Sequence, residues 1–118
     1  MRSWWLVFLA TISLIGGSPK LFAHAFLDHA NPRVGSSVRT PPREITLWFT
    51  QNLESAFSTI SVSGPSGQKV DDGRARISGS TMRIGIRPSG SGSYHVNWRV
   101  LSVDTHTTEG SFSFRVGE

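Results

Sequence analysis

The sequence predicts an all-β domain, either a two-sheet Greek-key sandwich or a flattened barrel of seven strands. Five segments alternate apolar and polar residues with a period of two, and turns rich in Gly, Pro, Ser and Asp separate them. No stretch beyond residue 24 has a helical period. Seven short antiparallel strands in roughly 95 residues are typical of this class.

Each strand is placed by its pattern. The expected strands are 24–30, 43–51, 57–63, 74–77, 81–87, 93–101 and 111–116. The expected core is Ile45, Leu47, Phe49, Ile60, Val62, Ile84, Ile86, Val96, Trp98, Val100, Phe112 and Phe114. Fully burying one such side chain contributes about 1.5–3 kcal/mol. That core is sufficient for one domain, although the chain has no cysteine to form disulfides.

Residues 1–23 are expected to be a secretory signal peptide, and residues 24–118 the mature domain. Arg2 gives a positive start, and the apolar run at 4–15 ends at a "GGSPK" breaker. This run is too short to cross a bilayer, which needs about 20 residues. An uncleaved anchor is the alternative. We expect export to the periplasm and a soluble, monomeric mature protein.

The charge pattern argues against nucleic acid as a partner. The leader contains Arg2 and Lys20, so the mature chain keeps 10 basic and 8 acidic residues, a net charge of 10 − 8 = +2. Its arginines are scattered along the sequence and form no basic patch, whereas nucleic-acid binding needs a clustered stripe.

No catalytic motif is apparent, which leaves four histidines, His24, His29, His95 and His106, as candidates for chemistry. Asp104 lies two residues before His106, so on an extended segment both side chains project from one face. A carboxylate and an imidazole suit Cu(II) or Zn(II). Taken alone, the pair is also compatible with solvated or capping side chains. His29 and His95 are expected to be exposed.

A stronger metal site results if His24 is the first residue of the mature chain. Its α-amine has a pKa near 8, against about 10.4 for lysine, so a metal displaces its proton at little cost. Amine and ring nitrogen chelate one ion together. With His106 and Asp104 they supply three nitrogens and one oxygen, the set that tetragonal Cu(II) prefers.

Three segments resemble the CopC family of periplasmic copper-binding proteins. They are "HAFL" at the expected mature start, "ITLWFTQNLESAFS" in the first half and "YHVNWRVLSVDTHTTEGSFSFRV" at the end. The resemblance implies a cupredoxin-like or immunoglobulin-like sandwich that binds Cu(II) through His24, Asp104 and His106. It further implies a copper carrier or buffer in copper resistance and homeostasis, without enzymatic activity, and a CopD-type inner-membrane protein as partner.

Two departures from the family limit what it implies. Gln51 occupies a position where some members carry glutamate near the copper, so we expect a nearby hydrogen-bonding residue there rather than a charged ligand. Some members hold Cu(I) in a methionine-rich loop, but this chain has only Met1 and Met82. Met1 is lost with the leader and Met82 alternates into the core, so we expect Cu(II) alone to bind.

The cleavage point decides whether the amine–histidine site exists. "AHA" at 23–25 fits the A-x-A rule and favours a cut after Ala25, because a cut before His24 places bulky Leu21 where a small residue is preferred. The family resemblance favours a cut before His24, which we adopt.

Two other functional classes stay open: a metal-free immunoglobulin-like interaction domain, and a histidine-brace copper oxidase or monooxygenase.

Overall fold

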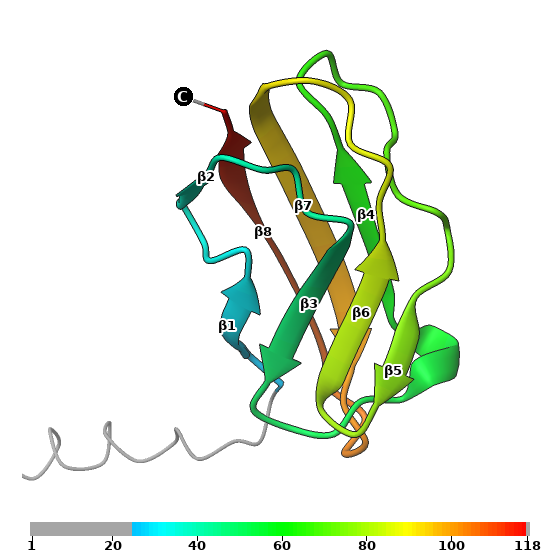
Figure 1. Cartoon of the computed structure of the whole chain (residues 1–118). Coiled ribbons are helices and arrows are strands. Elements are labelled where there is room, and N and C mark those ends of the chain that lie inside the picture. Colours follow the sequence, from blue (N-terminus) through cyan, green and yellow to red (C-terminus); the bar gives the residue numbers. More distant parts are fainter. Residues whose placement is uncertain (1–24, 118) are drawn as a thin grey trace, which may run out of the picture.

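The computed structural model describes residues 25–117, which form two four-stranded sheets packed face to face (Figure 1). The expected signal peptide and His24 lie outside the described residues. The first sheet has the order β1-β3-β6-β5, with β1 Leu27–Asn31, β3 Glu44–Phe49, β6 Thr81–Gly85 and β5 Arg76–Ser78. The second has the order β2-β8-β7-β4, with β2 Ser37–Val38, β8 Thr107–Val116, β7 Gly92–Leu101 and β4 Thr59–Ser63.

The fold class expected from the sequence is confirmed, and the two separate sheets make it a sandwich rather than a closed barrel. Each of the seven expected segments overlaps a strand, although β8 begins at Thr107, four residues before the expected start. The eighth strand, β2, was not predicted. It has two residues, pairs in parallel with β8, and is too short to show an alternating pattern. The chain passes repeatedly from one sheet to the other, as in Greek-key folds.

The core lies between the sheets, and all twelve residues expected in it are buried. The expectation that Met82 joins them is also confirmed. Tyr94 is fully buried and stacks on Phe114, with ring centroids 5.4 Å apart. Its hydroxyl accepts a hydrogen bond from the Ser89 amide and donates one to the Gly90 carbonyl, which satisfies the polar end of a buried ring.

The β7–β8 turn, the loop after β3 and the start of β1 lie at the same end of the sandwich. β7 and β8 pair along ten residues, from Gly92↔Val116 to Leu101↔Thr107, so the turn at 102–106 lies beyond the last pair. At that same end β3 stops at Phe49, the partner of Leu27 in β1. The amide of Val103 donates to the carbonyl of Asn52 over 3.0 Å, which ties the turn to the loop after β3.

Helical structure within residues 25–117 is confined to a 3₁₀ turn, Ser55–Phe57, and no helix there is long and apolar enough to cross a membrane.

Candidate metal centre

The β7–β8 turn is closed by its own backbone. The amide of Ser102 donates to the carbonyl of His106 over 3.0 Å, and the amide of Thr105 donates to the carbonyl of Ser102 over 2.8 Å. Thr105 has a φ of 70°, in the left-handed region that a β-branched residue rarely adopts. Such outliers persist where surrounding contacts enforce them, and they cluster at functional sites.

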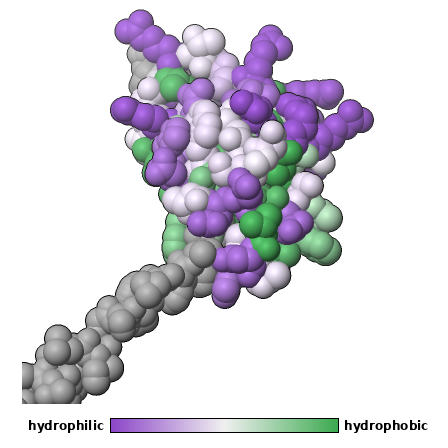
Figure 2. Space-filling model, turned by 90° about the horizontal axis from the view of Figure 1, so that it is seen from below, coloured by the Kyte–Doolittle hydropathy of each residue, from purple (hydrophilic) through white to green (hydrophobic). Residues whose placement is uncertain are grey.

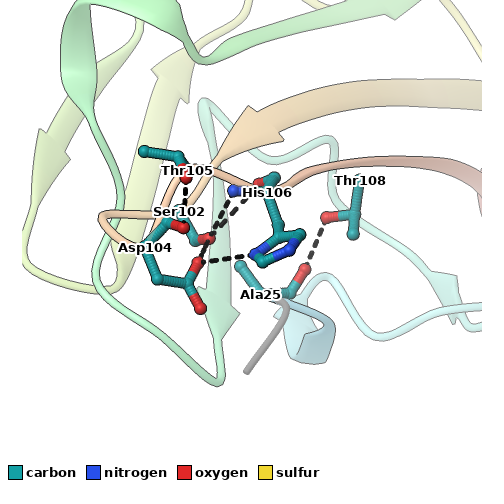
Figure 3. A network of polar contacts seen from close by, with 6 residues as sticks. All are labelled: Ala25, Ser102, Asp104, Thr105, His106 and Thr108. Carbon is teal, nitrogen blue, oxygen red and sulfur yellow. Dashed lines mark hydrogen bonds and ion pairs between the residues drawn. The ribbon is translucent and has the colours of Figure 1, made fainter. Parts of the chain in front are cut away.

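Asp104 and His106 converge at the surface of this turn (Figure 3). Nδ1 of His106 lies 3.4 Å from Oδ1 of Asp104. The aspartate side chain is 33% exposed and the histidine side chain 53% exposed. The structure therefore brings together the two residues of the D-x-H motif and leaves both accessible from solvent.

Buried Ser102 holds the carboxylate in place. Its hydroxyl donates to Oδ1 of Asp104 and lies 3.4 Å from the amide nitrogen of His106. The pKa of Asp104 is lowered, mainly by the Ser102 hydroxyl and further by His106, while partial burial opposes both. The carboxylate is therefore ionised at neutral pH and is available as an anionic oxygen donor.

Ala25, the first described residue, is fixed beside the same turn. The Thr108 hydroxyl donates to the Ala25 carbonyl over 2.6 Å, although the two residues are 83 positions apart in the sequence (Figure 3). The next residue is also held, because Phe26 and Thr50 join through two hydrogen bonds of 2.9 and 3.0 Å. Ala25 itself is fully buried. The start of the domain thus contacts both sheets.

Gln51 lies in the loop between these contacts. Its neighbour Thr50 bonds to Phe26, and its other neighbour Asn52 accepts from Val103. These contacts of its neighbours place Gln51, which is partly buried, at the same end of the sandwich as Asp104 and His106. Its expected role as a nearby hydrogen-bonding residue stays a prediction.

The other histidines are apart from this pair. His29 is exposed, stacks on Trp48 with ring centroids 4.3 Å apart, and bonds to Asp28 over 2.7 Å. His95 is exposed on β7 and bonds to Ser113 over 2.7 Å. Their expected exposure is confirmed.

Two donors do not make a copper site by themselves. Within residues 25–117, no group of three or more His, Cys, Asp or Glu side chains is arranged to hold a metal ion. The Asp104–His106 pair fits a borderline divalent ion in donor type but needs further ligands for it.

Apolar side chains flank this end of the molecule, which Figure 2 views from below. Phe26 follows Ala25 and is 55% exposed, and Val103 precedes Asp104 and is 49% exposed. Phe57, in the loop after β3, is 68% exposed. Exposed apolar side chains therefore occur near the start of the domain, in the loop after β3 and in the β7–β8 turn.

Comparison with known protein families matches residues 27–117 to the CopC domain. Among curated proteins, Protein YobA of Escherichia coli K12 is 33% identical over 112 residues, which cover 92% of this chain and 89% of that protein. Copper resistance protein C of Pseudomonas syringae pv. tomato is 33% identical over 103 residues, covering 80% of this chain and 81% of that protein. The chain therefore belongs to the CopC family.

Solved structures agree with this assignment. CopC from Methylosinus trichosporium OB3b superposes with a TM-score of 0.69 and 33% identity, over 79% of this chain and 93% of that one. PcoC from Escherichia coli, described as a methionine-rich copper resistance protein, has a TM-score of 0.67 and 31% identity, over 80% and 99% of the two chains.

Sequence reasoning missed Ser102 and Thr108. Ser102 lies two positions before Asp104. Its hydroxyl reaches the Asp104 carboxylate because the turn is closed, and no sequence motif indicates this hydrogen bond. Thr108 acts on a residue 83 positions away, and no local pattern signals such a contact.

We predict that Ser102→Ala raises the pKa of Asp104 toward its ordinary value of about 3.9, because the carboxylate loses its main hydrogen-bond donor. In the wild type, the lowered pKa stabilises the fold above that ordinary value, and this contribution disappears as the pH falls through the folded-state pKa. Titration of the Asp104 carboxyl carbon by NMR on metal-free protein measures the midpoint. Ser113→Ala, which removes a serine beside His95, serves as the control. Equal midpoints in wild type and Ser102→Ala would contradict the assigned cause.

Proposed function

We propose that this protein binds Cu(II) as cargo in the periplasm and carries or buffers it in copper resistance and homeostasis. The ligands are the α-amine and imidazole of His24, the imidazole of His106 and the carboxylate of Asp104. Membership of the CopC family, with copper resistance proteins among its relatives, supports copper as the cargo.

The observation that carries the proposal is the hydrogen bond from Thr108 to the Ala25 carbonyl. Consecutive α-carbons are about 3.8 Å apart, so residue 24 is attached directly to this fixed point. Thr108 is only two residues beyond His106 in the chain. We therefore infer that an N-terminal His24, joined directly to Ala25, can bring its amine and ring to the D-x-H pair.

The donor spacing is compatible with one metal ion. Adjacent ligands in a square plane with bonds of about 2.0 Å are roughly 2.8 Å apart, from the metal–nitrogen and metal–oxygen distances found in proteins. Nδ1 of His106 and Oδ1 of Asp104 are 3.4 Å apart, a gap that small side-chain rotations close. His24 supplies the two remaining nitrogens, which favours Cu(II) over its divalent neighbours.

The burial of Ala25 supports cleavage before His24. A cut after Ala25 would remove a fully buried residue together with the carbonyl that accepts from Thr108. The Thr108 hydroxyl is only part-buried, so losing its acceptor would cost about 0.5–1.5 kcal/mol, the net value of an ordinary hydrogen bond. Cleavage before His24 keeps this contact and exposes the amine beside the turn.

A carrier fits these residues better than an enzyme. An oxidative copper centre needs an open coordination position, and Asp104 fills one of the four equatorial positions here. A CopD-type inner-membrane protein is the partner that we propose for receiving or supplying the copper, and we expect the carrier to be a monomer.

The mature chain is expected to begin at His24. Intact-mass measurement of protein recovered from the periplasm after expression of the full sequence distinguishes this start from one at Phe26, because the two chains differ by two residues. A mature chain that starts at Phe26 would end the proposal of an amine–histidine site.

We expect His106→Ala to weaken Cu(II) binding by at least roughly 100-fold, because losing a group that merely orients a ligand already costs 10–100-fold. Competition titration against a chelator gives the affinity, and paramagnetic resonance should show one coordinating nitrogen fewer. His95→Ala, which removes an exposed histidine bonded to Ser113, is the matched control and should bind as the wild type does. Unchanged affinity in His106→Ala would instead favour a metal-free interaction domain.

The mature protein should not bind Cu(I) tightly. Soft thioethers are the ligands that retain Cu(I), and Met82, its one expected methionine, is fully buried between the sheets. Titration of Cu(I) against a colorimetric chelator under anaerobic conditions measures this. Stoichiometric Cu(I) that survives the chelator would refute the restriction to Cu(II).

A further inference from the structure

A polar cavity of about 550 Å³ lies at the side of the sandwich, away from the D-x-H pair. Its walls come from the loop after β4 and from the segment that follows β6. The lining residues are Lys69, Val70, Asp71, Asp72, Arg74 and Arg87. A neighbouring cavity of about 450 Å³ shares Arg87 and adds Arg43. The fold thus brings three basic residues that are scattered along the sequence to one cavity, together with two carboxylates.

Backbone hydrogen bonds on two sides hold the loop in place. The amide of Val70 donates to the Val62 carbonyl of β4 over 3.0 Å. On the opposite side, the Asp72 amide donates to the Gly85 carbonyl over 3.0 Å, and the Arg87 amide donates to the Val70 carbonyl over 2.8 Å. The loop that forms the cavity wall is therefore fixed to β4 on one side and to β6 and the segment after it on the other.

Both carboxylates of the cavity are engaged by the loop itself. The Asp71 side chain is 2% exposed, and its two oxygens accept from the amides of Val62 and Gly73 over 2.8 and 2.9 Å. Asp72 accepts from the amide of Arg74 over 2.9 Å. These carboxylates accept from backbone amides, and neither forms an ion pair with an arginine among residues 25–117.

The cationic groups are left to face solvent. Lys69 lies 3.6 Å from Asp71, but Arg74 and Arg87 have no ion-pair partner among residues 25–117. The lining of the larger cavity has a formal charge of 3 − 2 = +1, and adding Arg43 raises it to +2. Guanidinium groups present paired N–H donors that match the oxygens of phosphate.

We propose that this cavity binds a phosphate group, with Arg74 and Arg87 as its main donors and Lys69 as a third cation. The phosphate is either free in solution or part of an anionic phospholipid headgroup, since the recognising chemistry is the same. This site is independent of the copper proposal, because none of its residues belongs to the D-x-H turn.

The test uses isotope-labelled, metal-free protein expressed from the full sequence. Amide NMR shifts are followed during titration with sodium phosphate at near-neutral pH, against sodium chloride at matched ionic strength. We expect saturable shifts at 70–74 and 86–87. Arg74→Gln and Arg87→Gln should each weaken binding by about tenfold or more, the value of a hydrogen bond to a charged group. Arg115→Gln removes an exposed arginine elsewhere and should change binding less than twofold.

Vesicles distinguish the two sources of phosphate. Shifts with inorganic phosphate support a free anion, whereas Arg87-dependent binding only to phosphatidylglycerol vesicles, and not to phosphatidylcholine vesicles, supports a headgroup. Two results would overturn the site: no response at 70–74 to either probe beyond that to chloride, or equal weakening by Arg115→Gln and Arg87→Gln. Unchanged shifts outside the cavity establish that the variants fold.

Discussion

The candidate metal centre depends on the hydrogen bond that fastens the start of the domain to β8. Thr108 holds the Ala25 carbonyl from one sheet, and Thr50 pairs with Phe26 from the other. Without these contacts Ala25 would have no fixed position relative to the β7–β8 turn. A chelating chain end contributes affinity only when its position is restricted in advance, because ordering a free terminus costs about 1–2 kcal/mol for each residue fixed.

Most of the fold could be predicted from the sequence because it rests on a local signal. Alternation with a period of two identifies the inward face of each strand directly, so residues such as Ile45 and Val96 were placed correctly in the core. Two features escaped this signal. β2 is too short to show a period. The pattern also gives no sign that the Tyr94 hydroxyl closes the turn at Ser89 and Gly90.

Only part of the candidate metal centre could be predicted from the sequence in this way. Asp104 and His106 are close in sequence, and their spacing alone predicted that they converge. The contributions of Thr108 and of the basic cavity depend on pairs distant in sequence: Ala25 with Thr108, and Arg43 and Arg74 with Arg87. Such contacts follow from strand order and register, which a single sequence does not specify.

The register also explains how a cation site and a cationic cavity can occur in one small domain. β6 begins at Thr81, opposite Trp48 near the metal end, and finishes at Gly85, opposite Glu44, where the carbonyl of Gly85 accepts from Asp72 at the cavity. Four strand steps of about 3.4 Å separate those ends by roughly 14 Å. The Debye length at physiological ionic strength is about 8 Å, so Arg74 and Arg87 repel an ion at the metal end only weakly. The two proposed sites are therefore compatible, because ions of opposite charge would bind to them with little mutual penalty.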